Sequence, residues 1–465
     1  MSGLLFREVT LLDGRRVDVR VRGDRVVEVG PGLDGAGEDV VPGAGGTLVP
    51  GLVDHHLHLH AMAAAERSVA CGPPAVDGPD ALRRALAAAR PGADGWVRGT
   101  GYVESVAWDL DAAGLDRLHA GRPVRLQHRS GALWTVNSAG AALLDLAAAT
   151  HPGVERDAGG RPTGRLWRAD DWLRDRLGAD GPPALDAVGR RLTALGITAV
   201  TDATPDLSPA SVAALAAARA DGTLLPSVHL LGAPLDADLP AGLTAGPLKI
   251  VLADSGLPEF DPLVERIRAA HAAGRPVAVH VVSREALALL LAALDVAGGR
   301  AGDRIEHGAL VPADVVADLA RRGLRVVTQP GFLADRGDDY LRDVPAADHD
   351  DLYRAASLAA AGVPLALSSD APYGPLDPWR VIAAAVDRRT RSGAVVAPAE
   401  RLGAAAALAG YLAPPADPGG APRSVAVGAG ADLVLLTGTP DDVLDAPAAE
   451  RVRLVAVAGR TAHAS

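Results

Sequence analysis

Short runs of aliphatic and β-branched residues recur along the chain, and most are followed by a segment with helical periodicity. Several of these runs, such as 248–254 (LKIVLAD) and 275–283 (RPVAVHVVS), are nearly continuous in apolar residues, as strands covered on both faces are. Many of the intervening segments open with Ser, Asp or Pro and close with Gly, which are typical helix caps. Eight runs of this kind span residues 47–58, 196–204, 226–233, 248–254, 275–283, 303–310, 324–332 and 364–372.

The repeated alternation of strand and helix predicts an α/β fold in which eight parallel strands close into a (β/α)8 barrel of the TIM type. We expect this barrel domain to span residues 51–415. The spacing is broken once, because residues 61–195 separate the first run from the second, where a βα unit needs only roughly 15–25 residues. The pattern therefore predicts a large insertion after strand one.

The predicted insertion is rich in tryptophan. Because loops at the C-terminal face of a barrel often carry function, we favour a lid or a substrate wall for this segment. The alternative is a satellite hydrophobic core without contact to substrate. The tryptophans concerned are Trp96, Trp108, Trp134, Trp167 and, close behind them, Trp172, out of six in the chain.

The two ends of the chain share a different pattern, in which apolar and polar residues alternate between tight Gly turns. It occupies residues 9–30 near one end and residues 424–438 and 451–460 near the other. Period-two alternation indicates strands with one buried face. We therefore expect residues 1–50 and 416–465 to pair into one small β-domain beside the barrel.

Composition excludes several classes of protein. Hydrophobic residues make up 48% of the chain and charged residues 22%, which predicts a folded globular protein, and the formal net charge of −11 speaks against a nucleic-acid partner. Arg7 and Glu8 precede any apolar run long enough for a signal sequence, and no uncharged stretch reaches the ~20 apolar residues of a membrane span. We therefore expect a cytoplasmic protein without a membrane partner. Its single cysteine, Cys71, excludes a metal site built on cysteines.

Two histidines lie side by side at the end of the first predicted strand. His56 and His58 share one face of that strand because side chains alternate with period two, and two neighbouring imidazoles suit a metal ion. The alternative is that they are simple polar side chains at a strand end. His60 has the same parity and is placed by this reasoning at the mouth of the barrel rather than among the ligands.

Three later strands each supply one further candidate ligand: His280 in VAVHVV, His307 in IEHGA and Asp370 in SSDAP. Taken singly, a histidine in an apolar strand is more often a core residue with its hydrogen bonds satisfied. Together, however, the three residues lie toward the C-terminal ends of successive strands, where barrel enzymes have their active sites.

Lys249 is the only lysine among 46 basic side chains, in a chain that uses arginine everywhere else. An arginine cannot become neutral and nucleophilic, whereas a lysine can. A neutral amine can capture CO₂ as a carbamate, whose two oxygens can bridge two metal ions. The alternatives are an accidental lysine or a Schiff-base lysine, and the latter explains none of the histidines.

These residues resemble the pattern of the amidohydrolase superfamily, which has HxH on strand one, lysine on strand four, histidines on strands five and six and aspartate on strand eight. Several phrases resemble the branch that contains N-substituted formamide deformylases and related metal-dependent hydrolases: PGLVDHHLHLH (50–60), GRPTGRL (160–166), RIEHGAL (304–310), TQPGF (328–332), SSDAPYGPLDP (368–378) and VGAGADLVLL (427–436). The resemblance covers essentially the whole chain. It implies the large insertion and a composite β-sandwich domain built from both ends.

The chemistry implied by the resemblance is metal-dependent hydrolysis of a carbon–nitrogen bond, in an amide, formamide or cyclic amide rather than a peptide. It implies a hydroxide that bridges two divalent metal ions, zinc by default. Asp370 is the expected catalytic residue, first as general base and then as general acid. One ion is expected on His56, His58 and Asp370 and the other on His280 and His307, with carboxylated Lys249 bridging them.

The partner expected is a small-molecule substrate, and the family suggests a homodimer. Two alternatives to this function stay open: a deaminase of an aromatic or heterocyclic amine with a single metal ion, and a non-catalytic binding protein on the same fold. The residues expected to contact substrate are His60, Trp134, Asn137, Gln329 and Tyr373.

Overall fold

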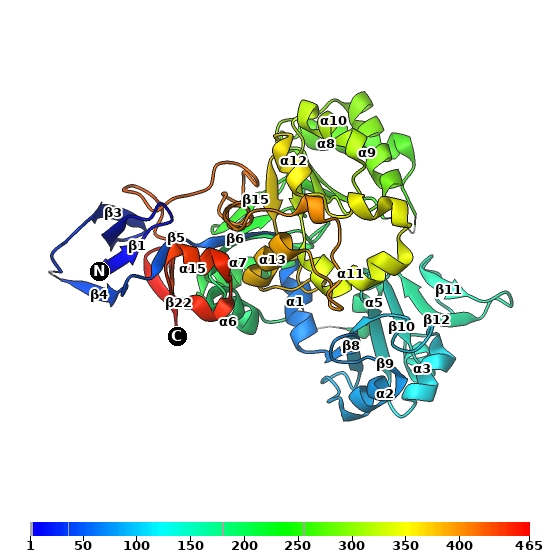
Figure 1. Cartoon of the computed structure of the whole chain (residues 1–465). Helices are drawn as coiled ribbons and strands as arrows, with labels where there is room; N and C mark the ends of the chain where they lie inside the picture. The colour runs from blue at the N-terminus through cyan, green and yellow to red at the C-terminus, as the bar shows by residue number, and fades with distance from the viewer. Residues whose placement is uncertain (1–2, 36, 179–180, 254–255) are drawn as a thin grey trace. The chain divides into compact units, whose positions relative to one another are not determined.

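The computed structural model describes residues 3–35, 37–178, 181–253 and 256–465, and it has an α/β fold (Figure 1). The chain divides into two compact units. Unit 1 comprises Met1–Leu59 and Leu185–Ser465, and unit 2 comprises His60–Ala184. Within the described part of the chain, no helix is both long enough and apolar enough to cross a membrane.

Strands from both ends of the chain lie in one sheet of unit 1. Its order is β23-β22-β21-β5-β1-β2-β3, with β4 paired to β1. The two ends meet where β5 pairs antiparallel with β21, with Val49 opposite Val434. The strands are β1 (Gly3–Thr10), β2 (Arg16–Arg22), β3 (Arg25–Gly30), β4 (Glu38–Pro42), β5 (Thr47–Pro50), β21 (Leu433–Leu436), β22 (Val452–Val457) and β23 (Arg460–Ala464).

The remaining strands of unit 1 are parallel and form two further sheets, ordered β15-β14-β13-β6 and β16-β17-β18-β19-β20. Each of the eight aliphatic runs of the sequence contains one of these strands, and β15 adds a short strand just ahead of the fourth run. The strands are β6 (Leu52–Leu57), β13 (Ile197–Asp202), β14 (Ser227–Leu230), β15 (Leu243–Ala245), β16 (Leu248–Val251), β17 (Val277–Val281), β18 (Arg304–His307), β19 (Arg325–Thr328) and β20 (Leu365–Leu367).

Backbone hydrogen bonds link the two parallel sheets at both of their ends. At one end, the amide of Lys249 on β16 donates to the carbonyl of Leu231 just after β14, at 3.0 Å. At the other, the amide of Asp370 just after β20 donates to the carbonyl of His56 on β6, at 2.8 Å. These bonds bring the C-terminal ends of β6 and β20 together.

A layer of helices packs on the sheet that contains β16–β20. Ile267 of α8, Leu290 of α9 and Leu319 of α10 form one hydrophobic cluster with Val279 and Ile305 of the strands, and Figure 1 shows these three helices close together. Because side chains alternate along a strand, the residues between those in the cluster point to the opposite side of the sheet, away from the helices.

The helices begin where the sequence provides caps. The hydroxyl of Ser208 accepts from the amide of Ser211 at the start of α7, and that of Ser283 accepts from the amide of Ala286 at the start of α9. Helix α1 (Leu59–Glu66) begins at the last residue before unit 2 and continues into it. The helices of unit 1 are α6 (Asp186–Ala194), α7 (Pro209–Ala220), α8 (Phe260–Ala272), α9 (Arg284–Ala297), α10 (Val316–Arg322), α11 (Gly331–Asp343), α12 (Ala356–Ala360), α13 (Pro378–Asp387), α14 (Ala404–Ala409) and α15 (Pro440–Asp445), with 3-10 turns at Ala313–Val315, Ala346–Asp351, Pro398–Glu400 and Ala449–Arg451.

Unit 2 has its own sheet and its own hydrophobic core. The sheet order is β11-β12-β10-β9-β8-β7, and Trp96 and Trp134 are buried in a cluster with Leu166 and Leu173. Its elements are β7 (Val69–Ala70), α2 (Pro79–Ala88), β8 (Val97–Tyr102), α3 (Ala112–Leu118), β9 (Val124–His128), β10 (Leu133–Val136), α4 (Ser138–Leu143), β11 (Val154–Arg156), β12 (Pro162–Trp167) and α5 (Asp170–Leu177). The residues after Ala184 return to unit 1, where α6 leads into β13.

Candidate metal centre

Polar side chains from several strands of unit 1 meet in one cluster, most of them from the C-terminal ends of their strands and Lys249 from the second residue of β16. The Nζ atom of Lys249 lies 3.4 Å from Nε2 of His56. Oδ1 of Asp370 lies 3.5 Å from the same Nε2 and 3.2 Å from Nε2 of His58. The atoms that His56, His307 and Asp370 could offer to a metal ion all lie within 4.8 Å of one another.

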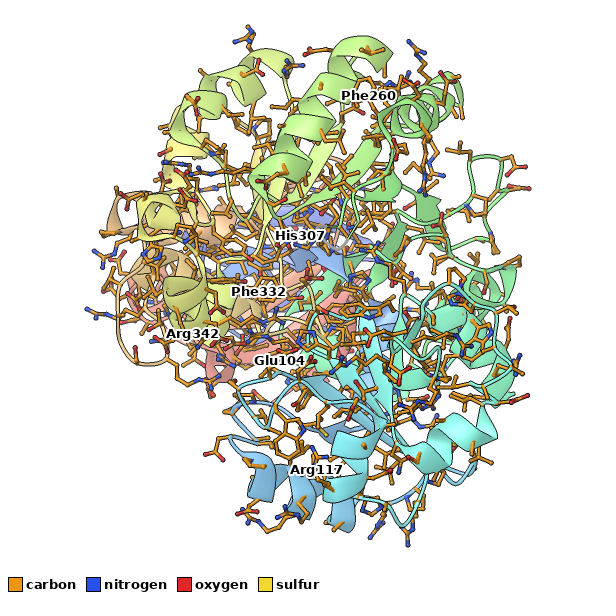
Figure 2. All side chains as sticks on the ribbon, turned by 90° about the vertical axis from the view of Figure 1, so that its right-hand side faces the viewer. Glu104, Arg117, Phe260, His307, Phe332 and Arg342 are labelled. Carbon is orange, nitrogen blue, oxygen red and sulfur yellow. The ribbon has the colours of Figure 1, made fainter. Side chains whose placement is uncertain are left out.

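The two remaining histidines extend this cluster. The ring centroid of His307 lies 4.8 Å from that of His56 and 4.5 Å from that of His280. His307 is in the interior of unit 1 (Figure 2), and its side chain is only 5% exposed. The structure thus brings together all six residues in which the sequence predicted metal ligands.

His56, His58 and His307 each have their Nδ1 atom held by a neighbouring side chain. Nδ1 of His56 donates to a carboxylate oxygen of Glu306. Nδ1 of His307 is 2.8 Å from Oε1 of Gln329, and Nδ1 of His58 is 3.2 Å from Oγ1 of Thr204. A carboxylate can only accept, so Nδ1 of His56 carries the proton and its Nε2 presents a lone pair to Lys249 and Asp370.

The orientation of Gln329 fixes the tautomer of His307 in the same way. The Nε2 group of Gln329 donates to the carbonyl of Val327 at 3.2 Å and to the hydroxyl of Ser368 at 2.9 Å. Its Oε1 atom is therefore the acceptor for His307, whose Nδ1 must carry the proton. In both His56 and His307, Nε2 is left as the atom available to a ligand.

Glu306 belongs to a fully buried ion pair. Its Oε1 atom accepts from Nε of Arg304 at 2.5 Å, and its other oxygen accepts from His56. Arg304 also donates through Nη2 to the carbonyl of His55, at 3.3 Å. Because both charged side chains are removed from water, neither can be lost without leaving the other uncompensated.

Two of the candidate ligands have a backbone conformation that L-residues rarely adopt. The φ angle is +74° at His307 and +55° at Asp370. Register places His307 opposite Val281, a residue in contact with the helix layer, yet the imidazole of His307 lies beside those of His56 and His280. The left-handed conformation accounts for this departure from strand alternation. Strain of this kind, about 1 kcal/mol or more at each position, is typical of functional sites.

Burial favours the neutral forms of three nitrogen side chains of the centre, those of His56, His307 and Lys249. Burial lowers the pKa of His56 and of His307 well below the ordinary value. Positive charge on a neighbouring side chain lowers the pKa further, mainly that of Lys249 for His56 and that of His280 for His307. Burial also lowers the pKa of Lys249 to about 8. Metal ions require deprotonated ligands. A buried set of neutral imidazoles, a carboxylate and a lysine amine therefore fits a borderline divalent cation such as Zn²⁺.

The residues expected to contact substrate fall into different environments. Tyr373 is half-buried beside the centre, with its ring edge-on to that of His58 at 5.4 Å between centroids. Gln329 is at the centre but is fully buried and holds His307, a role that the sequence did not predict. His60 is in α1, in the stretch of chain assigned to unit 2.

The other two expected substrate contacts are structural within unit 2. The amide oxygen of Asn137 accepts from the backbone of Val124 and Gly140, and its nitrogen donates to the carbonyls of His119 and Arg122. These four bonds use the whole hydrogen-bonding capacity of the side chain. Trp134 is buried, and its indole N–H donates to Asp170 at 2.8 Å. The insertion thus uses Trp134 and Asn137 to build its own core, and neither is carried further as a substrate contact.

The sequence analysis missed several residues that position the centre. Glu306 and Arg304 are at alternate positions of β18, on either side of Ile305, and point away from the helix layer. A charged pair at alternate positions of a fully buried strand is the signal that would have found them. Asp54 accepts from the backbone amides of His56 at 3.1 Å and Ser369 at 3.3 Å, so it ties the ends of β6 and β20 together. Burial raises the pKa of Asp54 to about 7.

Comparison with known proteins agrees with this geometry. The amidohydrolase family model matches residues 39–463. The N-substituted formamide deformylase of Arthrobacter pascens is 26% identical over 91% of this chain and 90% of that protein. Crystal structures of uncharacterized metal-dependent hydrolases from Pyrococcus horikoshii OT3 and Pyrococcus furiosus share the fold, with TM-scores of 0.76 and 0.70 and identities of 20% and 22%, over 96% and 94% of this chain and 99% of each of theirs. The chain therefore belongs to the amidohydrolase family and is a hydrolase that acts on carbon–nitrogen bonds.

Proposed function

We propose that this protein hydrolyses an amide, formamide or cyclic amide bond of a small molecule by activating a water molecule at a dinuclear metal centre. The observation that carries the proposal is the position of Lys249, the only lysine of the chain. It is 2% exposed, and its amine lies 3.4 Å from the ligand nitrogen of His56. The similarity to an N-substituted formamide deformylase supports formamides as the first substrates to test.

The proposed scaffold is a (β/α)8 barrel with unit 2 inserted after its first strand. Support comes from the parallel pairing of successive strands and from the backbone bonds that join β16 to β14 and β6 to β20. The strands contributed by residues 1–50 and 416–465 are proposed to form a composite β-sandwich domain beside it. In this arrangement the candidate ligands share the C-terminal face, where barrel enzymes have their active sites.

The proposed ligand set divides the six residues between two divalent ions, zinc by default. One ion would be held by His56, His58 and Asp370 and the other by His280 and His307, with carboxylated Lys249 as the bridge. When bound, such ions lower the pKa of water and polarise a carbonyl oxygen. The proton transfers are proposed to be carried out by side chains of this protein.

Carboxylation of Lys249 requires a neutral amine, which burial favours. In that step the nitrogen lone pair forms a bond to the carbon of CO₂, the electron pair of one C=O bond moves onto its oxygen, and the nitrogen releases one proton to water. Arg304 and Glu306 already neutralise one another, so a negatively charged carbamate would find its balancing charge in the metal ions. A guanidinium at this position cannot undergo the reaction because it stays protonated.

Asp370 is the proposed proton carrier. Its Oδ1 atom lies 3.2 Å from Nε2 of His58 and 3.5 Å from Nε2 of His56, so the carboxylate points into the centre. We propose that it accepts the proton of the attacking water and returns it to the departing nitrogen, which allows the amine to leave in neutral form. The two proton transfers are complementary, so Asp370 ends the cycle in the state in which it began.

A deaminase with a single metal ion is the second candidate function. The observation that favours it is the compactness of one group, since His56, His307 and Asp370 together could hold a single ion. Such an enzyme would release ammonia from an aromatic or heterocyclic amine and would have no need of Lys249.

The decisive experiment measures metal content per chain by elemental analysis after purification with bicarbonate, in wild type, Lys249→Ala and Lys249→Arg. About two ions in the wild type and one or none in both variants would support the dinuclear centre. Release of formate and amine from a panel of N-substituted formamides and amides would then identify the reaction. One ion in all three proteins, with ammonia release from aromatic amines, would refute the proposal and leave the deaminase.

A further inference from the structure

The three histidines held through Nδ1 have chemically different partners. His56 donates to the Glu306 carboxylate, His307 to the neutral amide of Gln329, and His58 lies against the hydroxyl of Thr204. A hydrogen bond to a carboxylate is stronger than one to a neutral oxygen and leaves more electron density on the opposite nitrogen. Of these three histidines, only His56 therefore has a charged acceptor behind its candidate ligand nitrogen.

The environment of Glu306 strengthens this effect. The carboxylate is fully buried, so no water competes for its oxygens, and each oxygen has one strong donor. Arg304 is 1% exposed and is anchored in turn to the carbonyl of His55, next to His56 in the chain. Arg304, Glu306 and His56 thus form a rigid chain of charge-assisted hydrogen bonds that ends at the candidate ligand atom.

Gln329, the partner of His307, is not part of a charged chain of this kind. Gln329 is also fully buried, and its amide is fixed by Val327 and Ser368, so it orients the ring of His307 as firmly as Glu306 orients that of His56. It carries no charge, however. His56 and His307 are therefore oriented equally firmly and differ in the charge of the side chain that holds them.

We propose that Glu306, held by Arg304, is a positioning residue that makes the metal position containing His56 the tighter of the two, so that the positions fill in sequence. This inference rests on the dinuclear centre proposed above. It assigns to Glu306 and Gln329 a role in metal affinity rather than contact with substrate. The ligand count acts in the same direction, since the His56 position would have three protein ligands besides the bridge and the other position two.

The test is a zinc titration of metal-free protein against a competing chelator, with bicarbonate present, on wild type, Glu306→Gln and Gln329→Glu. Glu306→Gln keeps the shape of the side chain and removes its charge, whereas Gln329→Glu places a carboxylate behind His307. The visible absorption of the cobalt-substituted proteins gives a second readout, because ligand-field bands respond to the coordination of each ion and not to global stability.

Two separate binding steps are expected in the wild type. Glu306→Gln should weaken the first step by roughly 10–100-fold and leave the second within about threefold, whereas Gln329→Glu should strengthen the second step and narrow the gap. An unchanged first step in Glu306→Gln would overturn the inference. If that variant fails to fold, a second step that is unchanged in Gln329→Glu overturns it equally. A wild type that binds no metal refutes the dinuclear centre itself, whereas two wild-type steps that neither variant alters refute only this inference.

Discussion

Replacement of Asp370 by asparagine tests the central chemical role without disturbing the backbone. The choice of asparagine follows from the φ angle of +55° at this position, because asparagine tolerates the left-handed region. Alanine in this conformation would destabilise the folded state by roughly 1–2 kcal/mol. Asparagine also has nearly the same shape as aspartate. The variant therefore removes the negative charge and the ability to accept the proton, and changes little else.

The expected loss follows from that role. A positioned general base and acid contributes roughly 10²–10⁴-fold, so kcat should fall by this factor, which corresponds to about 3–5 kcal/mol in the activation barrier. KM should change much less, because Asp370 is proposed to act on the proton rather than on substrate binding. Metal content should fall only in part, since His56, His58 and Lys249 would still hold the ion at that position.

The assay is steady-state hydrolysis of the best substrate from the formamide panel, with metal content and the thermal midpoint measured on the same preparations. Asp370→Ala is the matched control: it should lose the same activity and also show a lower midpoint because of the strained backbone. Full metal content together with full turnover in Asp370→Asn would remove Asp370 from proton transfer. A loss of activity that parallels the loss of metal would leave it as a ligand only.

Three further outcomes are expected. A strong chelator should abolish turnover. Zinc with bicarbonate should restore turnover more completely than zinc alone, because carboxylation of Lys249 needs CO₂ as well as metal. Equal recovery without CO₂ would count against a carboxylated Lys249. Burial lowers the pKa of His229 from 6.5 to about 4, so below pH 6.5 the unfolded chain binds a proton at this residue that the folded chain does not. The share of His229 in the loss of stability between pH 6.5 and 4 should be roughly 3 kcal/mol, so urea unfolding of His229→Gln should lose less stability than wild type over this range by about that amount, and an equal loss in both proteins would contradict this. Trp134→Phe should lower the free energy of unfolding by roughly 1.5–3 kcal/mol, because the hydrogen bond to Asp170 is lost, and it should leave the metal content unchanged. Normal stability together with an altered substrate preference would instead indicate that Trp134 contacts substrate.

Much of the fold and the identity of the candidate ligands could be predicted from local sequence patterns. The apolar runs correspond to parallel strands because a strand covered on both faces must be apolar at nearly every position. The positions of His56, His280 and Asp370 near strand ends were enough to predict that they meet, since parallel strands place their C-terminal ends at one edge. Lys249 was identified by composition alone.

The tertiary structure decided what lies behind those ligands. Glu306 and His56 are 250 residues apart, and their contact depends on the stagger of strands that do not adjoin in sequence, which no local pattern encodes. Gln329, just after β19, was predicted to contact substrate, and the structure shows that its amide oxygen holds Nδ1 of His307. A histidine at position 307 should have faced the helix layer by strand alternation, and only the left-handed backbone there brings its ring to the centre.

The insertion shows the same division. The presence of an insertion and its tryptophans are evident in the sequence, because the regular spacing of strands fails there. Its predicted end at residue 195 included α6, which belongs to unit 1, since unit 2 ends at Ala184. Which way those residues face is a property of packing: Trp134 and Asn137 satisfy their hydrogen bonds inside unit 2. Residue type and period determined which side chains could bind a metal ion, whereas strand stagger and the demand that buried polar groups be paired determined which neighbours hold them in place.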